Sequence, residues 1–186
     1  MFLTLILIVA VSLYRLVLPS ENFAPLSAIA ICGGMYLSRR MSLMVVVGLM
    51  LISDFWVNLV KYQGAYGLFP PEVLGHYAGF LVALMLGWWI RPRKKLWTVA
   101  GGTVAASVLF FAFSNFVSWL VDAYPKNLGG LWQCFTVGLP GYPSTIAFFL
   151  RTLASDVIFT GLFVAVSELA ARELPDTRFK WLLAQV

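Results

Sequence analysis

Charged residues are scarce in this sequence. Only 11% of its 186 residues are Asp, Glu, Lys or Arg, whereas 61% are hydrophobic, and the mean hydropathy is +0.87. Because soluble domains carry roughly a quarter charged residues, this composition excludes a soluble domain and predicts an integral membrane protein. The length suits one helical domain over residues 1–186, with about six spans of roughly 20 apolar residues each.

Cysteine and histidine are also rare, and signatures of metal sites and enzymes are missing. Cys32, Cys134 and the single His76 form no metal-ligand spacing, and whether Cys134 or His76 touches a ligand stays open. The chain has no H-E-x-x-H, no G-x-S-x-G and no Gly-rich phosphate loop. Asp54 and Asp156 invite comparison with intramembrane aspartyl proteases, but Asp156 lacks their glycine-flanked pattern. We therefore expect no metal, no cofactor and no enzyme activity.

The apolar segments predict an all-α membrane bundle of six transmembrane helices. The spans are expected at about 2–18, 23–37, 43–60, 73–90, 97–121 and 146–171. A cleaved signal peptide is the alternative for residues 2–18, but a basic n-region and a clear cleavage site are missing there. Residues 122–145 are expected to form a long loop, apolar but interrupted by glycine and proline.

The basic residues predict the orientation of the chain in a cell (inner) membrane. With six spans, nine of them fall on one side, and that side should be cytoplasmic and hold both termini. These nine are Arg39, Arg40, Arg91, Arg93, Lys94, Lys95, Arg172, Arg178 and Lys180. The opposite side holds only Lys61 and Lys126. Aromatic and basic residues are not interleaved as in nucleic-acid surfaces, so we expect no nucleic-acid partner.

Polar side chains within the apolar spans are the candidate binding residues, because burying them in a bilayer is costly unless a pathway, ligand or partner group needs them. Asp54 and Asn58 are four residues apart and share one helix face, as do Asn115 and Trp119. In the orientation above, most of these groups lie in the outer halves of their spans. The predicted substrate-binding set is Asp54, Asn58, Asn115, Trp119, Arg151 and Asp156, with Asn22 and the 122–145 loop as a cap.

Charge neutralisation inside the bundle is the alternative for the ionisable members of this set. Asp54 or Asp156 would then pair with Arg15 or Arg151. Arg151 and Asp156 are five residues apart, which is about 140° around a helix, so they are not expected to pair with each other. Arg15 lies near the outer end of the first span and is expected to extend to the lipid headgroups.

Four segments resemble an uncharacterised family of small bacterial integral membrane proteins. They are residues 22–30 (NFAPLSAIA), 51–54 (LISD), 110–116 (FFAFSNF), and 124–156, where Tyr-Pro, Gly-Leu, Cys134 and the stretch from Pro140 to Asp156 carry the likeness. The similarity covers about residues 15–165. That family is similar, more distantly, to the S components of energy-coupling-factor (ECF) vitamin transporters, which are six-helix proteins that bind vitamins or metal ions on the outer face beneath capping loops.

The resemblance implies capture of a small, vitamin-like solute for uptake, with ECF transmembrane and ATPase subunits as candidate partners beside the lipid bilayer. S components carry an Ala-x-x-x-Ala pattern on their first helix that faces the coupling subunit. Ala24 and Ala28 have this spacing, but they lie near the outer end of the second span. The alternative function is a structural or assembly subunit of a larger membrane complex, with the small residues of the second span as its partner interface.

Overall fold

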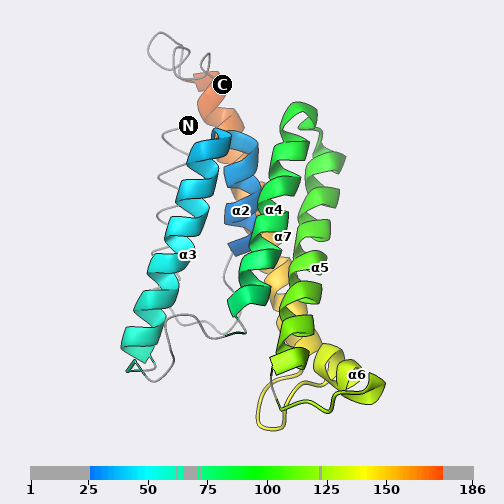
Figure 1. Cartoon of the computed structure of the whole chain (residues 1–186). Helices are drawn as coiled ribbons and strands as arrows, with labels where there is room; N and C mark the ends of the chain where they lie inside the picture. Colours follow the sequence, from blue (N-terminus) through cyan, green and yellow to red (C-terminus); the bar gives the residue numbers. More distant parts are fainter. Residues whose placement is uncertain (1–25, 62, 65–70, 72, 122, 174–186) are drawn as a thin grey trace.

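The structure is a computed structural model, and it describes residues 26–61, 63–64, 71, 73–121 and 123–173. Every regular element within these residues is a helix, as the sequence predicts (Figure 1). The helices are α2 (Leu26–Tyr36), α3 (Arg39–Lys61), α4 (Val73–Ile90), η1 (Arg91–Arg93), α5 (Leu96–Val121), α6 (Leu128–Thr136) and α7 (Thr145–Glu173). The expected first span at 2–18 and Asn22 lie outside the described residues.

Four of these helices, α3, α4, α5 and α7, are long and apolar enough to cross a membrane. The chain is therefore a membrane protein. α2 differs, because its 11 residues rise only about 16 Å at 1.5 Å per residue, against the roughly 30 Å of a bilayer core. In the described part of the chain, the second predicted span is thus a half-length helix that begins part-way along α4 and α5 (Figure 1).

Small residues bring α4 into backbone contact with α2 and α5. Gly75, Gly79, Ala83 and Gly87 recur every four residues along α4, a spacing that allows close helix approach. A Cβ on Gly34 of α2 would lie 2.5 Å from the carbonyl oxygen of Leu84, and one on Gly87 would collide with the carbonyl oxygen of Ile31. A Cβ on Gly79 would lie 2.9 Å from Cα of Phe110 in α5. We call the Gly34–Gly87 contact the α2–α4 seam.

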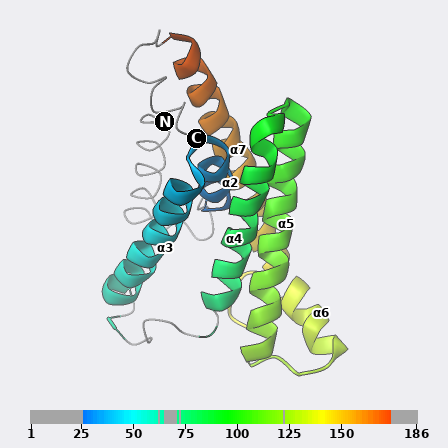
Figure 2. The same ribbon diagram turned by 45° about the horizontal axis from the view of Figure 1, so that its top comes forward.

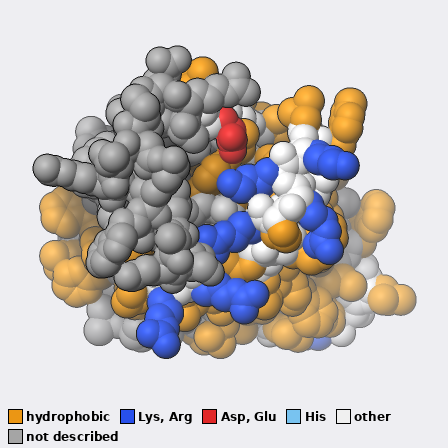
Figure 3. Space-filling view, turned by 90° about the horizontal axis from the view of Figure 1, so that it is seen from above, with side chains coloured by type: hydrophobic (Ala, Val, Ile, Leu, Met, Phe, Trp, Pro, Cys, Tyr) orange, Lys and Arg blue, Asp and Glu red, His pale blue; other side chains and the backbone are white. Residues whose placement is uncertain are grey.

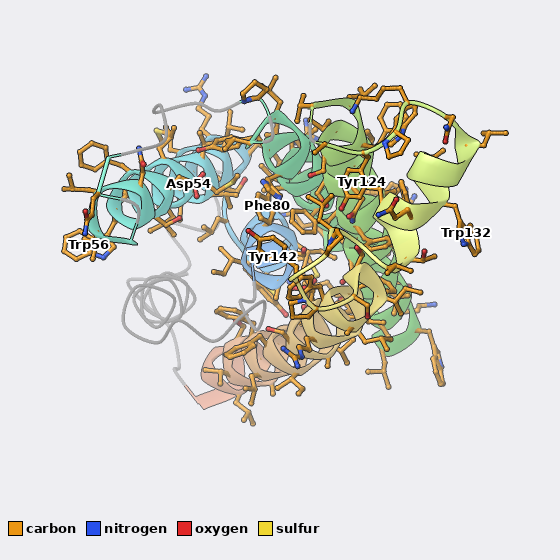
Figure 4. All side chains as sticks on the ribbon, turned by 90° about the horizontal axis from the view of Figure 1, so that it is seen from below. Asp54, Trp56, Phe80, Tyr124, Trp132 and Tyr142 are labelled. Carbon is orange, nitrogen blue, oxygen red and sulfur yellow. The ribbon has the colours of Figure 1, made fainter. Side chains whose placement is uncertain are left out.

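α2 occupies the centre of the bundle. It contacts α3, α4, α5 and α7, and every residue from Ser27 to Met35 is buried. Seen along the bundle, α2 is surrounded by the longer helices (Figure 4). The small residues predicted for a helix contact therefore pack within this chain, and they are not available on its surface.

One end of the bundle, here called the basic end, gathers positive side chains (Figure 3). It carries Arg39, Arg40, Arg91, Arg93, Lys94 and Lys95 at the adjoining ends of α3, α4 and α5. The Lys94 ammonium lies 4.3 Å from the ring centroid of Tyr36, whose hydroxyl donates a 3.0 Å hydrogen bond to Glu168. Burial lowers the pKa of Lys94, and the negative charge of Glu168 opposes that shift.

The opposite end, here called the α6 end, holds a helix that the sequence did not predict. α6 interrupts the expected 122–145 loop and lies beside the end of α5, roughly level with the end of α3 (Figures 1 and 2). Toward this end α3 diverges from α4 in both views. The candidate functional residues are distributed around this end.

Candidate functional site

Residues 123–144 form an ordered cap at the α6 end, and α6 is its rigid part. The Asn127 side chain accepts a 2.8 Å hydrogen bond from the backbone N–H of Gly130, which caps the start of α6. Gly130 lies so close to Pro125 that a Cβ there would collide with the Pro125 carbonyl oxygen. At the other end of α6, the Gln133 amide donates a 3.2 Å hydrogen bond to the carbonyl of Gly138. Only nine residues of this segment are helical, and a few local contacts fix the shape of the segment.

Directional contacts fasten the cap to α5. The Cys134 thiol donates to the carbonyl of Asn115 at 3.2 Å, and the indole N–H of Trp119 donates to the carbonyl of Pro125 at 2.9 Å. The Lys126 ammonium in turn donates to the carbonyl of Trp119. Cys134 is fully buried, so its thiol acts in this structure as a packing and hydrogen-bonding group.

An aromatic cluster fills the space between the cap and the two spans it connects. Phe111 of α5 packs edge-on against Phe135 of α6, with ring centroids 5.5 Å apart. The same ring lies 4.6 Å from the ring centroid of Phe149 in α7. These three rings join α5, α6 and α7 through apolar contact, a geometry that aromatic pairs favour.

The turn between α6 and α7 carries an exposed tyrosine that the sequence analysis did not single out. Gly138 and Gly141 both have positive φ, at 82° and 88°, which glycine adopts without strain. Between them and α7, Tyr142 is 71% exposed and projects over the centre of the bundle, along the axis of α2 (Figure 4). The sequence did contain a signal for this turn, because Gly138 is followed closely by Gly141-Tyr142-Pro143. Two glycines and a proline around a tyrosine indicate a turn that presents an aromatic side chain.

Asp156, one of the predicted site residues, lies in the core between α2, α5 and α7. Its side chain is 0% exposed. One carboxylate oxygen accepts a 3.1 Å hydrogen bond from the backbone N–H of Ala28, and the other accepts a 2.7 Å hydrogen bond from the hydroxyl of Ser107. Ala28 belongs to the first turn of α2, whose N–H groups have no partner within the helix. Asp156 therefore caps α2 from a different helix.

The surroundings of Asp156 hold hydroxyl groups rather than opposite charges. Ser155 and Thr160 of α7 are buried, and among the described residues the Ser155 hydroxyl has no hydrogen-bond partner. Within that part of the chain no arginine or lysine pairs with Asp156, so its charge is balanced by the hydrogen bonds and by the positive end of the α2 dipole. Asp156 and Arg151 do not pair with each other there, as their five-residue spacing predicts.

Asp54 and Asn58 lie on α3, across α2 from Asp156. Both side chains are partly buried. Asp54 is on the side of α3 that faces α4 and α2, whereas Trp56 points away from the bundle (Figure 4). α3 and α7 pack on different sides of α2. The structure thus brings Asp54 and Asn58 to one helix face but does not bring them together with Asp156.

Asn115 and Trp119 lie one turn apart near the end of α5, directly beneath the cap. The Asn115 amide donates a 2.8 Å hydrogen bond to the carbonyl of Phe111 in the preceding turn. The Trp119 ring contacts Phe116 at a centroid distance of 5.8 Å, and its N–H is already bonded to Pro125. The two residues are therefore held in place by the cap, with the amide oxygen of Asn115 taking no part in the bonds described.

Arg151 and His76 sit at the edge of the bundle. Arg151 is exposed and shares a face of α7 with Ala154 and Ile158, which are also exposed. That face lies away from Asp156 and suits contact with headgroups. His76 is exposed at the start of α4 and stacks on Phe110, with centroids 5.8 Å apart. Across the described residues, no group of His, Cys, Asp and Glu is arranged to hold a metal ion.

Comparison with known proteins places the chain in a family. It belongs to DUF6580, a family of unknown function, which it matches over residues 1–177. No curated protein and no solved structure matches the chain.

Proposed function

We propose that this protein binds a small, planar or vitamin-like solute at the α6 end and supports its uptake across the membrane, without chemistry on the solute. In this proposal the α6 end faces outward and the basic end faces the cytoplasm, as the distribution of arginine and lysine favours. In this proposal the chain has six spans, with α2 as part of the second, and both termini face the cytoplasm. Its architecture and role resemble those of an ECF S component.

The observation that carries the proposal is the built cap. Residues 123–144 are longer than a connection between two spans needs to be. They are nevertheless fixed by the hydrogen bond that Asn127 accepts and by those that Cys134 and Trp119 donate, and they present Tyr142 over the axis of α2. The described part of α2 begins part-way along α4 and α5 (Figure 1). In this proposal the solute binds on the cap side of α2, where Tyr142 contacts it.

Each proposed site residue has a role that its position allows. Asp54 and Asn58 of α3 supply polar groups from one wall, and Asn115 supplies its amide oxygen from another. Trp119 offers a ring face, since its N–H is occupied, and Tyr142 stacks on the solute from the cap. Pockets of this kind combine aromatic walls with a few placed polar groups.

Arg151 and Asp156 take supporting roles in this proposal. Asp156 holds the start of α2 in position through Ala28 and Ser107, and Arg151 extends toward the headgroups. Ala28 is fully buried against Asp156, so an Ala-x-x-x-Ala contact through Ala24 and Ala28 is not a favourable route for docking an ECF transmembrane subunit. Uptake by the protein without an ATPase module is therefore part of the proposal.

The alternative, an assembly subunit, predicts a partner on the small-residue face of α2. That face is buried within the chain from Ser27 to Met35, which favours solute binding over this form of assembly. Purification in mild detergent separates the two functions. A co-purifying small molecule, identified by mass spectrometry of the extracted protein, supports uptake, whereas a stoichiometric protein partner without a small molecule contradicts it.

Substitutions test the site itself once the solute is identified. Asp54→Ala, Asn115→Ala and Tyr142→Ala should each weaken solute binding at least about fivefold, since each removes a group worth about 1–3 kcal/mol. Trp56→Ala is the matched control, because Trp56 is two residues from Asp54 on the outward face of α3 (Figure 4). Isothermal titration and the thermal midpoint are measured together. Wild-type affinity in all three variants, or equal loss in Trp56→Ala, would contradict the site.

A further inference from the structure

The cap also has a face that no part of the described chain covers. Leu128 and Trp132 are four residues apart on α6 and so share one helix face. They are 84% and 72% exposed. Trp132 points outward at the edge of the bundle, in contrast to Tyr142 on the same cap (Figure 4). The opposite face of α6 carries the buried Gly130 and Cys134, and Cys134 docks this face on α5. An apolar helix face beside the ends of spans requires a specific environment.

The position of α6 identifies that environment. α6 begins shortly after α5 ends at Val121 and lies level with the span ends rather than beyond them (Figures 1 and 2). The same end of α5 also leaves Phe116 and Leu120 exposed, and such residues face lipid in a membrane-spanning helix. α6 contains no acidic or basic side chain that would require full hydration.

The spacing of tryptophans along α5 gives the depth. Trp97, 84% exposed, stands at the basic end, and Trp119 stands beneath the cap. Along α5 the two are separated by about 33 Å, close to the roughly 30 Å thickness of a hydrocarbon core. Tryptophans mark both interfaces of a bilayer. Trp132 belongs to the cap that Trp119 holds through its hydrogen bond to Pro125, and it is therefore near the second interface.

We propose that α6 is an interfacial helix, with Leu128 and Trp132 inserted at the boundary between headgroups and acyl chains of a phospholipid bilayer. Short helices with one apolar aromatic face bind in this plane. The cap is then held from two sides, by α5 through directional hydrogen bonds and by lipid through Leu128 and Trp132. This proposal does not depend on the identity of any solute or on solute binding.

The test places an environment-sensitive fluorophore on single cysteines in the full-length protein in nanodiscs of phosphatidylcholine and phosphatidylglycerol. Leu128→Cys and Trp132→Cys report the proposed face, and Tyr142→Cys is the control, since it has nearly the same exposure as Trp132 on the same cap. Cys32 and Cys134 are buried, and the unsubstituted protein measures their background labelling. Quenching is compared between lipids spin-labelled near the headgroup and aqueous iodide.

At positions 128 and 132 the lipid quencher should act roughly threefold more strongly than at 142, with iodide showing the reverse order. Iodide quenching at 128 and 132 equal to that at 142 would overturn the proposal, because the face would then lie in water. Protection of both labels from both quenchers would overturn it as well, since the face would then be covered by protein. Agreement of two positions guards against a disturbed fold in one variant, and circular dichroism checks each variant.

Discussion

The α2–α4 seam and the cap both depend on glycine, but for different reasons. In the seam, Gly34 and Gly87 let two helices touch along their backbones, and the contact needs no directional bond. In the cap, Gly138 and Gly141 shape a turn, and the segment is then fixed by single hydrogen bonds such as that from Cys134 to Asn115. The seam belongs to the permanent core. The cap instead rests on a few directional hydrogen bonds.

The largest expected effect breaks the seam. Gly87→Leu places a side chain against the Ile31 carbonyl and should lower the free energy of unfolding by at least about 3 kcal/mol, because overpacking forces the backbones apart. The matched control is Gly101→Leu, since a Cβ on Gly101 meets no atom within 4 Å. Thermal unfolding in detergent, followed by circular dichroism, measures both. Equal thermal midpoints for the two variants would contradict the backbone contact between α2 and α4.

A smaller loss of stability is expected where Asp156 of α7 holds the first turn of α2. Ser107→Ala removes a hydrogen bond to a buried carboxylate and should destabilise the protein by about 1–3 kcal/mol. Ser155→Ala, one residue from Asp156, removes a buried hydroxyl without a partner among the described residues and should be neutral or slightly stabilising. Chemical or thermal unfolding should therefore show a loss of stability in Ser107→Ala and no loss in Ser155→Ala. The same loss in both would contradict the arrangement around Asp156.

The smallest expected effect is confined to the cap and so separates the stability of the cap from that of the α2–α4 seam. Asn127→Ala removes the N-cap of α6, worth about 1 kcal/mol, whereas Asn127→Ser keeps a capping oxygen. Hydrogen–deuterium exchange in peptides from α6 should become about fivefold faster in the alanine variant. Peptides from α4 and α5 should exchange as in the unsubstituted protein. Faster exchange throughout the bundle would mean that the cap and the seam are one cooperative unit.

Four helices long enough to span a membrane were readable from the sequence, because long apolar segments stand out by their hydropathy. α4 occupies residues 73–90, and α5 begins within one residue of its expected start. α6 was not predicted, because nine residues with two adjacent glycines give no clear helical period. Its one local signal was Asn127 at the N-cap position. Short helices held by tertiary contacts are beyond what composition can indicate.

The candidate site was predictable only in part, for a related reason. Polar residues in apolar helices could be identified, and the shared face of Asp54 and Asn58 follows from spacing. The partner of Asp156 could not be identified from the sequence, because Ala28 is 128 residues away along the chain and contributes only its backbone N–H. Tyr142 was missed because an exposed tyrosine in a loop is unremarkable until the fold places it over the bundle axis.

The bond between Asp156 and the first turn of α2 restricts how this bundle can move. If α2 and α7 separated, a carboxylate and a backbone N–H would be left without partners in a dry interior, at a cost of several kcal/mol. The two helices should therefore move as one body in any rearrangement of the bundle. α3, which diverges from α4 toward the α6 end, is then the wall with the freedom to tilt.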